Sequence, residues 1–392
     1  MILADRVTNI RSSATLAVSA KAQELKAQGR SILSLSVGEP DMSTPEFICE
    51  AAKIAIDARL TRYTPVPGRP SLRSAVAGYF ERFYGVKVEK DNIIISNGGK
   101  HSLYSIFQAL INPGEQVIIP APYWVSFPPM VELAGGKPTI VYTTPEHDFK
   151  VTVDDLEQNF TPKTKVVVLN SPSNPTGAAY SQKEVDAIAR WVVEKNIILL
   201  SDETYDRLVF SPNEPVSLSP WWEKHPENFV ISGGLSKSFA MTGWRVGYTL
   251  ACTGLVKAIS RLQGQSTSNV CSIAQAAALA ALSTEDFSTV EDMRKTFERR
   301  RDLVYGILST WEGVICPKPQ GAFYIFPDVS ALFTPEYPDS ASLCTTLLSE
   351  AGVAVVPGVA FGNDNCIRIS FAVSDEVIVE ALEKMRKVLY KQ

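Results

Sequence analysis

Polar residues and glycines directly follow five short apolar segments of this 392-residue chain. The segments cover 92–96, 116–119, 165–169, 197–201 and 228–231, and their β-branched, apolar composition predicts buried strands. The groups that follow them are Gly98-Gly99-Lys100, Pro122-Tyr123-Trp124, Asn170 through Gly177, Asp202 through Tyr205, and Ser232 through Lys237. Because ligands of an open parallel sheet bind at the carboxyl ends of its strands, we expect these groups to form one site.

The glycine pair Gly98-Gly99 stands between a predicted strand and a predicted helix that runs to Leu110. A helix that begins in this way presents free N–H groups and the positive end of its dipole, which suits a phosphate. A tight strand-to-helix turn explains the same pair without a ligand. The segment is no Walker A loop, because Ile94 takes the place of its first glycine, and the chain has no G-x-G-x-x-G fingerprint.

The predicted strands alternate with helical segments, which favours an α/β fold with a mostly parallel central sheet and helices on both faces. Helices are also predicted over 14–28, ending at Gly29, and over 71–83, 284–308 and 375–389. Strands over 322–326 and 366–371 indicate a smaller α+β domain. We predict a large domain over 46–291 and a small domain formed by 1–45 and 292–392.

The composition argues against several kinds of partner. Hydrophobic residues make up 45% and charged residues 20% of the chain, and the formal net charge is −4, so we expect no nucleic acid. The chain shows no signal-peptide core and no apolar run that would span a bilayer, so we expect no membrane contact. The scattered cysteines indicate reduced thiols and a cytoplasmic location. The histidines lack metal-ligand spacing, so we expect no metal.

Five ordered motifs resemble those of the class I aminotransferases of pyridoxal-phosphate (PLP) fold type I, in particular the bacterial-type aspartate aminotransferase subgroup. They are Val37-Gly38-Glu39-Pro40, Pro122-Tyr123-Trp124, Asn170 through Gly177, Asp202 through Tyr205, and Ser236-Lys237 through Arg245. The resemblance covers nearly the whole chain. It implies an enzyme that moves the amino group of L-aspartate to 2-oxoglutarate by way of PLP, giving oxaloacetate and L-glutamate.

The resemblance assigns the cofactor chemistry to a small set of residues. Lys237 would bind PLP covalently and later carry a proton, since a desolvated lysine is readily neutral and nucleophilic. Asp202 would hold the pyridine nitrogen protonated, while Tyr205 and Asn174 would bind the phenolate oxygen. Trp124 would stack on the ring. Three of these residues also have a purely structural interpretation. Asp202 could be the N-cap of a helix, Asn174 part of a plain Asn-Pro turn, and Trp124 a core residue.

The phosphate would lie on the amides of Gly98, Gly99 and Lys100, with Arg245 and Ser236 beside it. Many relatives carry a hydroxyl residue three positions before the lysine, where this chain has Gly234. Ser236 or Ser232 would replace it. Tyr63 resembles the tyrosine that reaches the phosphate of the neighbouring subunit, which implies a homodimer with shared active sites.

On the substrate side, Arg368 matches the arginine that binds the α-carboxylate, for which its planar fork is suited. The backbone of Gly38 would close over the same carboxylate, and Trp124 and Asn174 would also contact the substrate. Lys100, Ser13 and Thr15 match residues that meet the distal carboxylate, where a surface lysine and an N-cap serine are the structural alternatives.

Three other functions fit parts of the pattern. The same pocket would serve another acceptor: prephenate, an aromatic 2-oxo acid or pyruvate. A PLP lyase of this fold would need Lys237 and Asp202 as well. A PLP-binding regulator would carry an added DNA-binding module, but the resemblance begins within the first few tens of residues and leaves no room for one.

Overall fold

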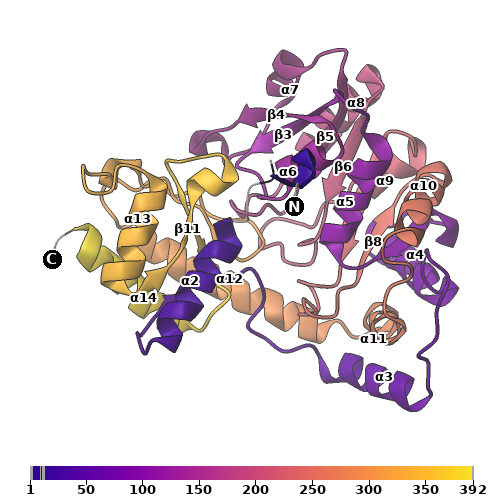
Figure 1. Cartoon of the computed structure of the whole chain (residues 1–392), viewed down its shortest axis with the longest axis horizontal. Coiled ribbons are helices and arrows are strands. Elements are labelled where there is room, and N and C mark those ends of the chain that lie inside the picture. The colour runs from indigo at the N-terminus through magenta and orange to yellow at the C-terminus, as the bar shows by residue number, and fades with distance from the viewer. Residues whose placement is uncertain (1–2, 9, 11–13, 391–392) are drawn as a thin grey trace.

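The computed structural model describes residues 3–8, 10 and 14–390. A seven-stranded sheet forms the larger part of the molecule, with the strand order β2-β8-β7-β6-β5-β3-β4 (Figure 1). Strands β7, β6, β5, β3 and β4 pair with one another in parallel, whereas β8 is antiparallel to both of its neighbours, β2 and β7. The strands are β2 (Ile93–Ser96), β3 (Gln116–Ala121), β4 (Lys137–Tyr142), β5 (Thr164–Asn170), β6 (Ile198–Asp202), β7 (Phe229–Gly234) and β8 (Gly247–Leu250).

Alternation along the strands divides the side chains between two cores. In β5, Val167 and Leu169 join the core on one face, while Val166 and Val168 join the core on the other. Helices α5 (Gly99–Leu110), α6 (Phe127–Leu133) and α10 (Thr253–Gly264) supply the second core. The first core takes side chains from α3 (Glu46–Asp57), α4 (Pro70–Tyr84), α7 (Val153–Asn159), α8 (Gln182–Lys195), α9 (Ser219–Lys224) and α11 (Ser272–Ser283). The predicted mostly parallel sheet with helices on both faces is confirmed.

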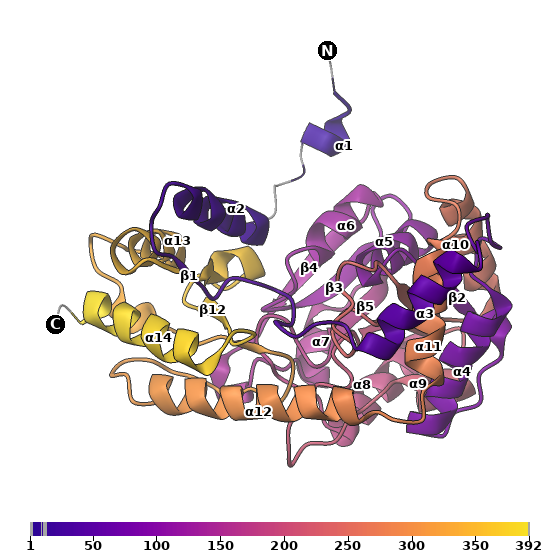
Figure 2. The ribbon, with the colours of Figure 1, turned by 90° about the horizontal axis from the view of Figure 1, so that it is seen from below.

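A further core lies at the other end of the molecule (Figures 1 and 2). Its antiparallel sheet has the order β11-β12-β9, and β1 pairs with β10 in a separate parallel ladder. Helix α2 packs there through Ala22 and Leu25, against Ile32 and Ala354. The elements are α2 (Ala14–Ala27), β1 (Leu33–Ser34), β9 (Tyr324–Ile325), α13 (Ser340–Thr346), β10 (Val353–Ala354), β11 (Val356–Pro357), β12 (Ile367–Ser370) and α14 (Asp375–Leu389). In Figure 2, helix α12 (Ser288–Leu308) runs from α14 toward the large sheet.

Two features of the sheet and one helix start differ from the sequence prediction. Strand β4 was not predicted, because it is an edge strand with little buried apolar surface and ends at Tyr142, which is 73% exposed. The antiparallel β8 was also not predicted. Helix α12 begins at Ser288 rather than at residue 284. The Thr284 side chain accepts a hydrogen bond from the backbone N–H of Asp286, and the Asp286 side chain accepts one from the backbone N–H of Ser288. These local bonds compete with the helical ones. No helix among the described residues is long and apolar enough to cross a membrane.

Candidate active site

A cavity of about 460 Å³ lies where the large sheet meets the β9–β12 region. It brings together most of the residues predicted to do chemistry. Those that line it are Gly38, Gly99, Lys100, Trp124, Asn174, Asp202, Tyr205, Ser236, Lys237, Arg245 and Arg368. Gly98 lies next to the guanidinium group of Arg245. Tyr63 does not line the cavity and is 92% exposed, and Ser13 and the side chain of Thr15 fall outside the described part of the chain.

The register of the sheet explains why these groups meet. Asn170 is aligned with Asp202 across β5 and β6, and Asp202 is aligned with Ser232 across β6 and β7. The three strands are parallel, so the loops that follow them leave the sheet at the same edge. Asn174, Tyr205 and Lys237 belong to those loops.

Lys237 is held at the centre of the cavity by its own loop and by the segment that contains Gly38. Its Nζ donates a hydrogen bond to the Gly38 carbonyl oxygen at 2.5 Å. Burial lowers the pKa of Lys237 to about 8; Glu39 opposes this shift, and Arg368 adds to it. The side chain is therefore an amine that gives up its proton near neutral pH, as a nucleophile or proton carrier must.

Asp202 is buried at the end of β6, with 5% of its surface exposed. Thr204 donates to its Oδ1 from both the backbone N–H, at 3.2 Å, and Oγ1, at 2.6 Å. Burial raises the pKa of Asp202 to about 6 in spite of these bonds. A bound cation beside the carboxylate would offset that desolvation, so the site suits a protonated ring nitrogen.

Arg368 lies on β12 and is 3% exposed. Its Nη1 donates to Asn174 Oδ1 at 3.1 Å and its Nη2 to the Ser36 carbonyl oxygen at 2.7 Å. In the described part of the chain, its buried Nε has no hydrogen-bond partner. A buried guanidinium with unused donor capacity favours an anion in the cavity.

The start of α5 forms a cradle that only glycine permits. Gly98 has φ +85°, and a Cβ there would come within 2.4 Å of Arg245 Nη2. A Cβ on Gly247 would come within 2.6 Å of the Gly99 nitrogen. The free N–H groups of the helix start and the Arg245 guanidinium can therefore approach the same anion closely.

Lys100 and Trp124 close the cavity on the side of α5. The Lys100 Nζ lies 5.0 Å from the centre of the Trp124 ring, and burial together with nearby Arg245 lowers the pKa of this lysine. The donor set as a whole offers a phosphate cradle, a buried carboxylate, an aromatic face and a reactive lysine. These residues fit PLP.

The structure separates the two serines considered as replacements for the hydroxyl missing at Gly234. The Ser232 hydroxyl is fully buried and donates to Ser102 Oγ at 3.0 Å, away from the cavity lining. Ser236 lines the cavity. Of the two, Ser236 is therefore the one that borders the cavity.

The sequence prediction missed several residues that line the cavity, among them Thr204 and Tyr324. Thr204 stands inside the Asp202–Tyr205 motif, and its position two residues after an aspartate was the available signal, since such pairs form local hydrogen bonds. Tyr324 lies in a predicted strand, where the sequence alone does not say which side chains face the cavity.

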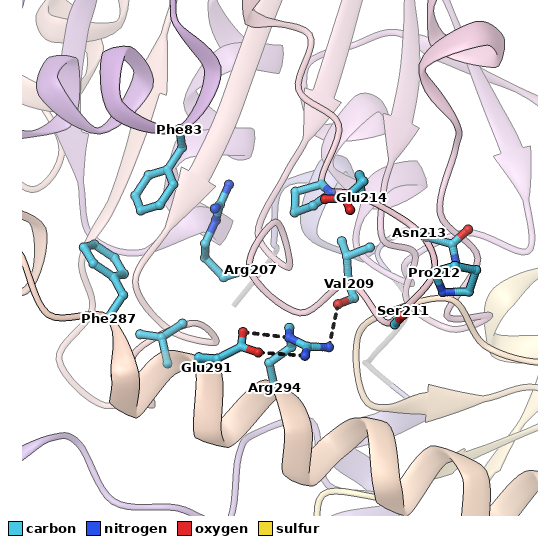
Figure 3. Close-up of a pocket in the computed structure, with 12 residues that line it drawn as sticks. Phe83, Arg207, Val209, Ser211, Pro212, Asn213, Glu214, Phe287, Glu291 and Arg294 are labelled. Atoms are coloured by element: carbon cyan, nitrogen blue, oxygen red, sulfur yellow. Dashed lines mark hydrogen bonds and ion pairs between the residues drawn. The ribbon is translucent and has the colours of Figure 1, made fainter.

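A second cavity of about 500 Å³ lies between α4, the segment 207–215 and α12 (Figure 3). Its arginine Arg294 is bound by Glu291 and Glu298. The other arginine, Arg207, stacks on Phe83 with 4.1 Å between the guanidinium carbon and the ring centre. None of the predicted site residues lines it. Among the described residues there is also no cluster of three or more side chains suited to a metal.

Comparison with known proteins assigns the chain to a family. The chain belongs to the family of class I and II aminotransferases, whose model matches residues 30–385. It is 43% identical over 391 residues to the asparagine–oxo-acid transaminase of Streptococcus mutans, covering 99% of both chains. It is 44% identical over 395 residues to the aspartate/prephenate aminotransferase of Cereibacter sphaeroides, covering 98% of both.

Solved structures agree with this assignment. The aspartate aminotransferase of Thermus thermophilus with maleate matches with a TM-score of 0.94 and 40% identity, covering 99% of this chain and 100% of that one. The protein is thus an aminotransferase, and its cofactor is PLP, which the enzymes of this family use.

Proposed function

We propose that this enzyme transfers the amino group of L-aspartate to 2-oxoglutarate in two half-reactions that share the cavity around Lys237. The observation that carries the proposal is the convergence of Lys237, Asp202 and Arg368 on that one cavity. When bound there, PLP supplies an electron sink that stabilises negative charge at the substrate's α-carbon.

Each cofactor-facing residue has a task that follows from its chemistry. Lys237 would hold the cofactor through Nζ, and its amine would move the proton at the substrate's α-carbon. Asp202 keeps a proton on the ring nitrogen, and its burial strengthens this ion pair. Tyr205 and the side-chain N–H group of Asn174 would donate to the phenolate oxygen, while Trp124 would stack on the ring.

Arg368 binds the α-carboxylate in this proposal. Its buried Nε, which lacks a partner within the described chain, and its Nη groups supply the donors. The backbone of Gly38 lies on the same side of the cavity, next to Lys237 Nζ. For a dicarboxylate, Lys100 meets the second carboxylate, with Ser13 and Thr15 as its helpers.

We further propose a homodimer in which Tyr63 reaches the phosphate of the neighbouring subunit. Tyr63 is almost fully exposed in the single chain and contacts no part of its own cavity. Exposed apolar side chains gather on the same stretch of chain, namely Phe47, Ile54, Ile56 and Leu60. Apolar surface of this kind is typical of subunit contacts.

The enzyme would work as two bodies, 46–291 on one side and 1–45 with 292–392 on the other. The cores support this division, because Val290 packs in the large-sheet core and Met293, one turn later on α12, packs in the core of the other end. Since Gly38 and Arg368 belong to the smaller body, its closure would complete the carboxylate site. A cytoplasmic location is proposed with it, supported by the free cysteines of the described chain.

A second candidate differs in the substrates and keeps the mechanism. The relative from Cereibacter sphaeroides is named for aspartate and prephenate, and the one from Streptococcus mutans for asparagine. We expect Lys100→Ala to lower kcat/KM for aspartate by roughly tenfold, because an ion pair is lost, and to leave alanine or phenylalanine unchanged. Steady-state kinetics over a panel of donors and acceptors, prephenate and asparagine included, would measure this.

The proposed function is tested by the visible absorption spectrum of the purified enzyme. Adding L-aspartate without an acceptor should convert the PLP band to that of the amino form, and 2-oxoglutarate should restore it. If the band did not change with aspartate but changed with asparagine, asparagine would be the amino donor. If prephenate alone restored the band, prephenate would be the acceptor. The absence of any band with added PLP would overturn the proposal.

A further inference from the structure

We infer that Tyr324 is a positioning residue, whose ring orients the Arg368 guanidinium and whose hydroxyl sets the direction of the Tyr205 proton. The inference rests on the proposed function, because it takes from there the tasks of Arg368 and Tyr205. Tyr324 is on β9, is 1% exposed and lines the cavity.

The ring of Tyr324 lies against the arginine. The guanidinium carbon of Arg368 is 4.5 Å from the ring centre, and the two strands that carry them pair with Ile325 opposite Ile369. A guanidinium over an aromatic face is attracted to it, so the ring of Tyr324 helps to hold Arg368 in place. Arg368 gains no comparable support from a carboxylate, because its hydrogen bonds within the described chain go to Asn174 and Ser36.

The hydroxyl of Tyr324 lies at a junction of the site. It is 3.0 Å from the Tyr205 hydroxyl, and a Cβ on Gly38 would lie 3.2 Å from it. Each phenol has one proton to give. When Tyr205 donates to the phenolate oxygen of the cofactor, it has no proton left for Tyr324, so the bond between the two tyrosines must run from Tyr324 to Tyr205.

A donor bond into Tyr205 polarises its O–H group and strengthens what it donates onward. Both phenols remain protonated at neutral pH, because burial raises the pKa of Tyr205 and of Tyr324. The charged groups that face the pair are Arg368, Asp202, Glu39 and Lys237. Tyr324 thereby joins the residue that binds the substrate carboxylate to the residue that binds the cofactor oxygen.

Two substitutions separate the tasks of the ring and the hydroxyl. Tyr324→Phe keeps the ring over Arg368 and removes only the donor, so the onward bond of Tyr205 weakens and the covalent link at Lys237 holds its proton more tightly. We expect the pH midpoint of the visible band of the holoenzyme to rise by roughly 0.3 units, less than in Tyr205→Phe. The dissociation constant of maleate, a dicarboxylate probe, should stay within about twofold of the parent value. It is measured at a pH where the visible band of both the variant and the parent is fully converted.

Tyr324→Leu removes the ring as well, and here maleate should bind roughly tenfold more weakly. Tyr337→Phe is the matched control, because Tyr337 is a buried tyrosine of the same core that lies outside the cavity lining. An unshifted midpoint in Tyr324→Phe, or an equal shift in the control, would overturn the task of the hydroxyl. Unchanged maleate binding in Tyr324→Leu would overturn that of the ring. A parent enzyme without a visible band would instead refute the proposed function.

Discussion

Asp202 and Asn170 end neighbouring strands of one sheet, whereas Arg368, Tyr324 and Gly38 reach the same cavity from separate segments at the other end of the molecule. The cofactor side is therefore held by the register of parallel strands. The carboxylate side is held by packing between two cores. Changes to Asp202 should therefore affect the cofactor and changes to Arg368 the substrate, whereas Tyr324 joins the two sides through its bond with Tyr205.

The largest expected effect is that of Lys237→Ala. It removes the amine that attaches the cofactor and moves the proton, so we expect kcat to fall by about 10⁴-fold or more. The visible band should revert to that of free PLP. Stopped-flow and steady-state assays with L-aspartate measure the loss. A variant that kept full turnover with bound PLP would disprove the role of this lysine and the comparison built on it.

Arg368→Lys tests the opposite side of the cavity. The lysine keeps the charge and loses the planar fork, so kcat/KM should fall by about 10²-fold for every amino acid donor. The cofactor spectrum in the absence of substrate should stay as in the parent. If the dissociation constant of PLP rose as strongly as KM, the two sides of the cavity would not be separable.

Asp202→Asn should make the apoprotein more stable at high pH. The folded pKa of Asp202, about 6, lies above its ordinary value of 3.8, so the folded state loses stability as pH rises through this range. The variant lacks this loss and should gain about 3 kcal/mol over the parent at pH 8, a difference that vanishes near about pH 3. Urea unfolding of both apoproteins measures it. Addition of PLP should reverse the order, because only the parent can pair with the ring nitrogen.

Gly234→Ser should give the smallest effect and the only gain in cofactor binding. A Cβ at Gly234 meets its nearest neighbour, the Val246 carbonyl oxygen, at 3.4 Å and lies 3.9 Å from the Gly99 nitrogen, on the side of the phosphate cradle. An added hydroxyl should lower the PLP dissociation constant by roughly threefold. Gly233→Ser is the matched control, since its Cβ would come within 2.5 Å of the Tyr248 ring and should destabilise the fold. Fluorescence titration with PLP would reveal weaker binding in Gly234→Ser if the cradle has no room.

The sequence predicted the parts of the fold whose signals are local. Strands β2, β3, β5, β6 and β7 are buried on both faces and read as continuous apolar runs, and α2 ends before Gly29, which has φ +83°. The edge strand β4 and the antiparallel β8 have no such signal. The first displays polar and half-buried residues, and the second includes a glycine and a threonine in place of a continuous apolar run, so both depend on what they pair with.

For the site, the order of the motifs along the chain determined which residue types meet, because strands of a parallel sheet bring their following loops to one edge. Tertiary structure decided which side chain does which task. Ser232 was turned toward Ser102 and Ser236 toward the cavity, and Tyr324 was placed between Tyr205 and Arg368. Side-chain direction at the end of a strand and the approach of a second core are long-range packing outcomes, and no local pattern of residues encodes them.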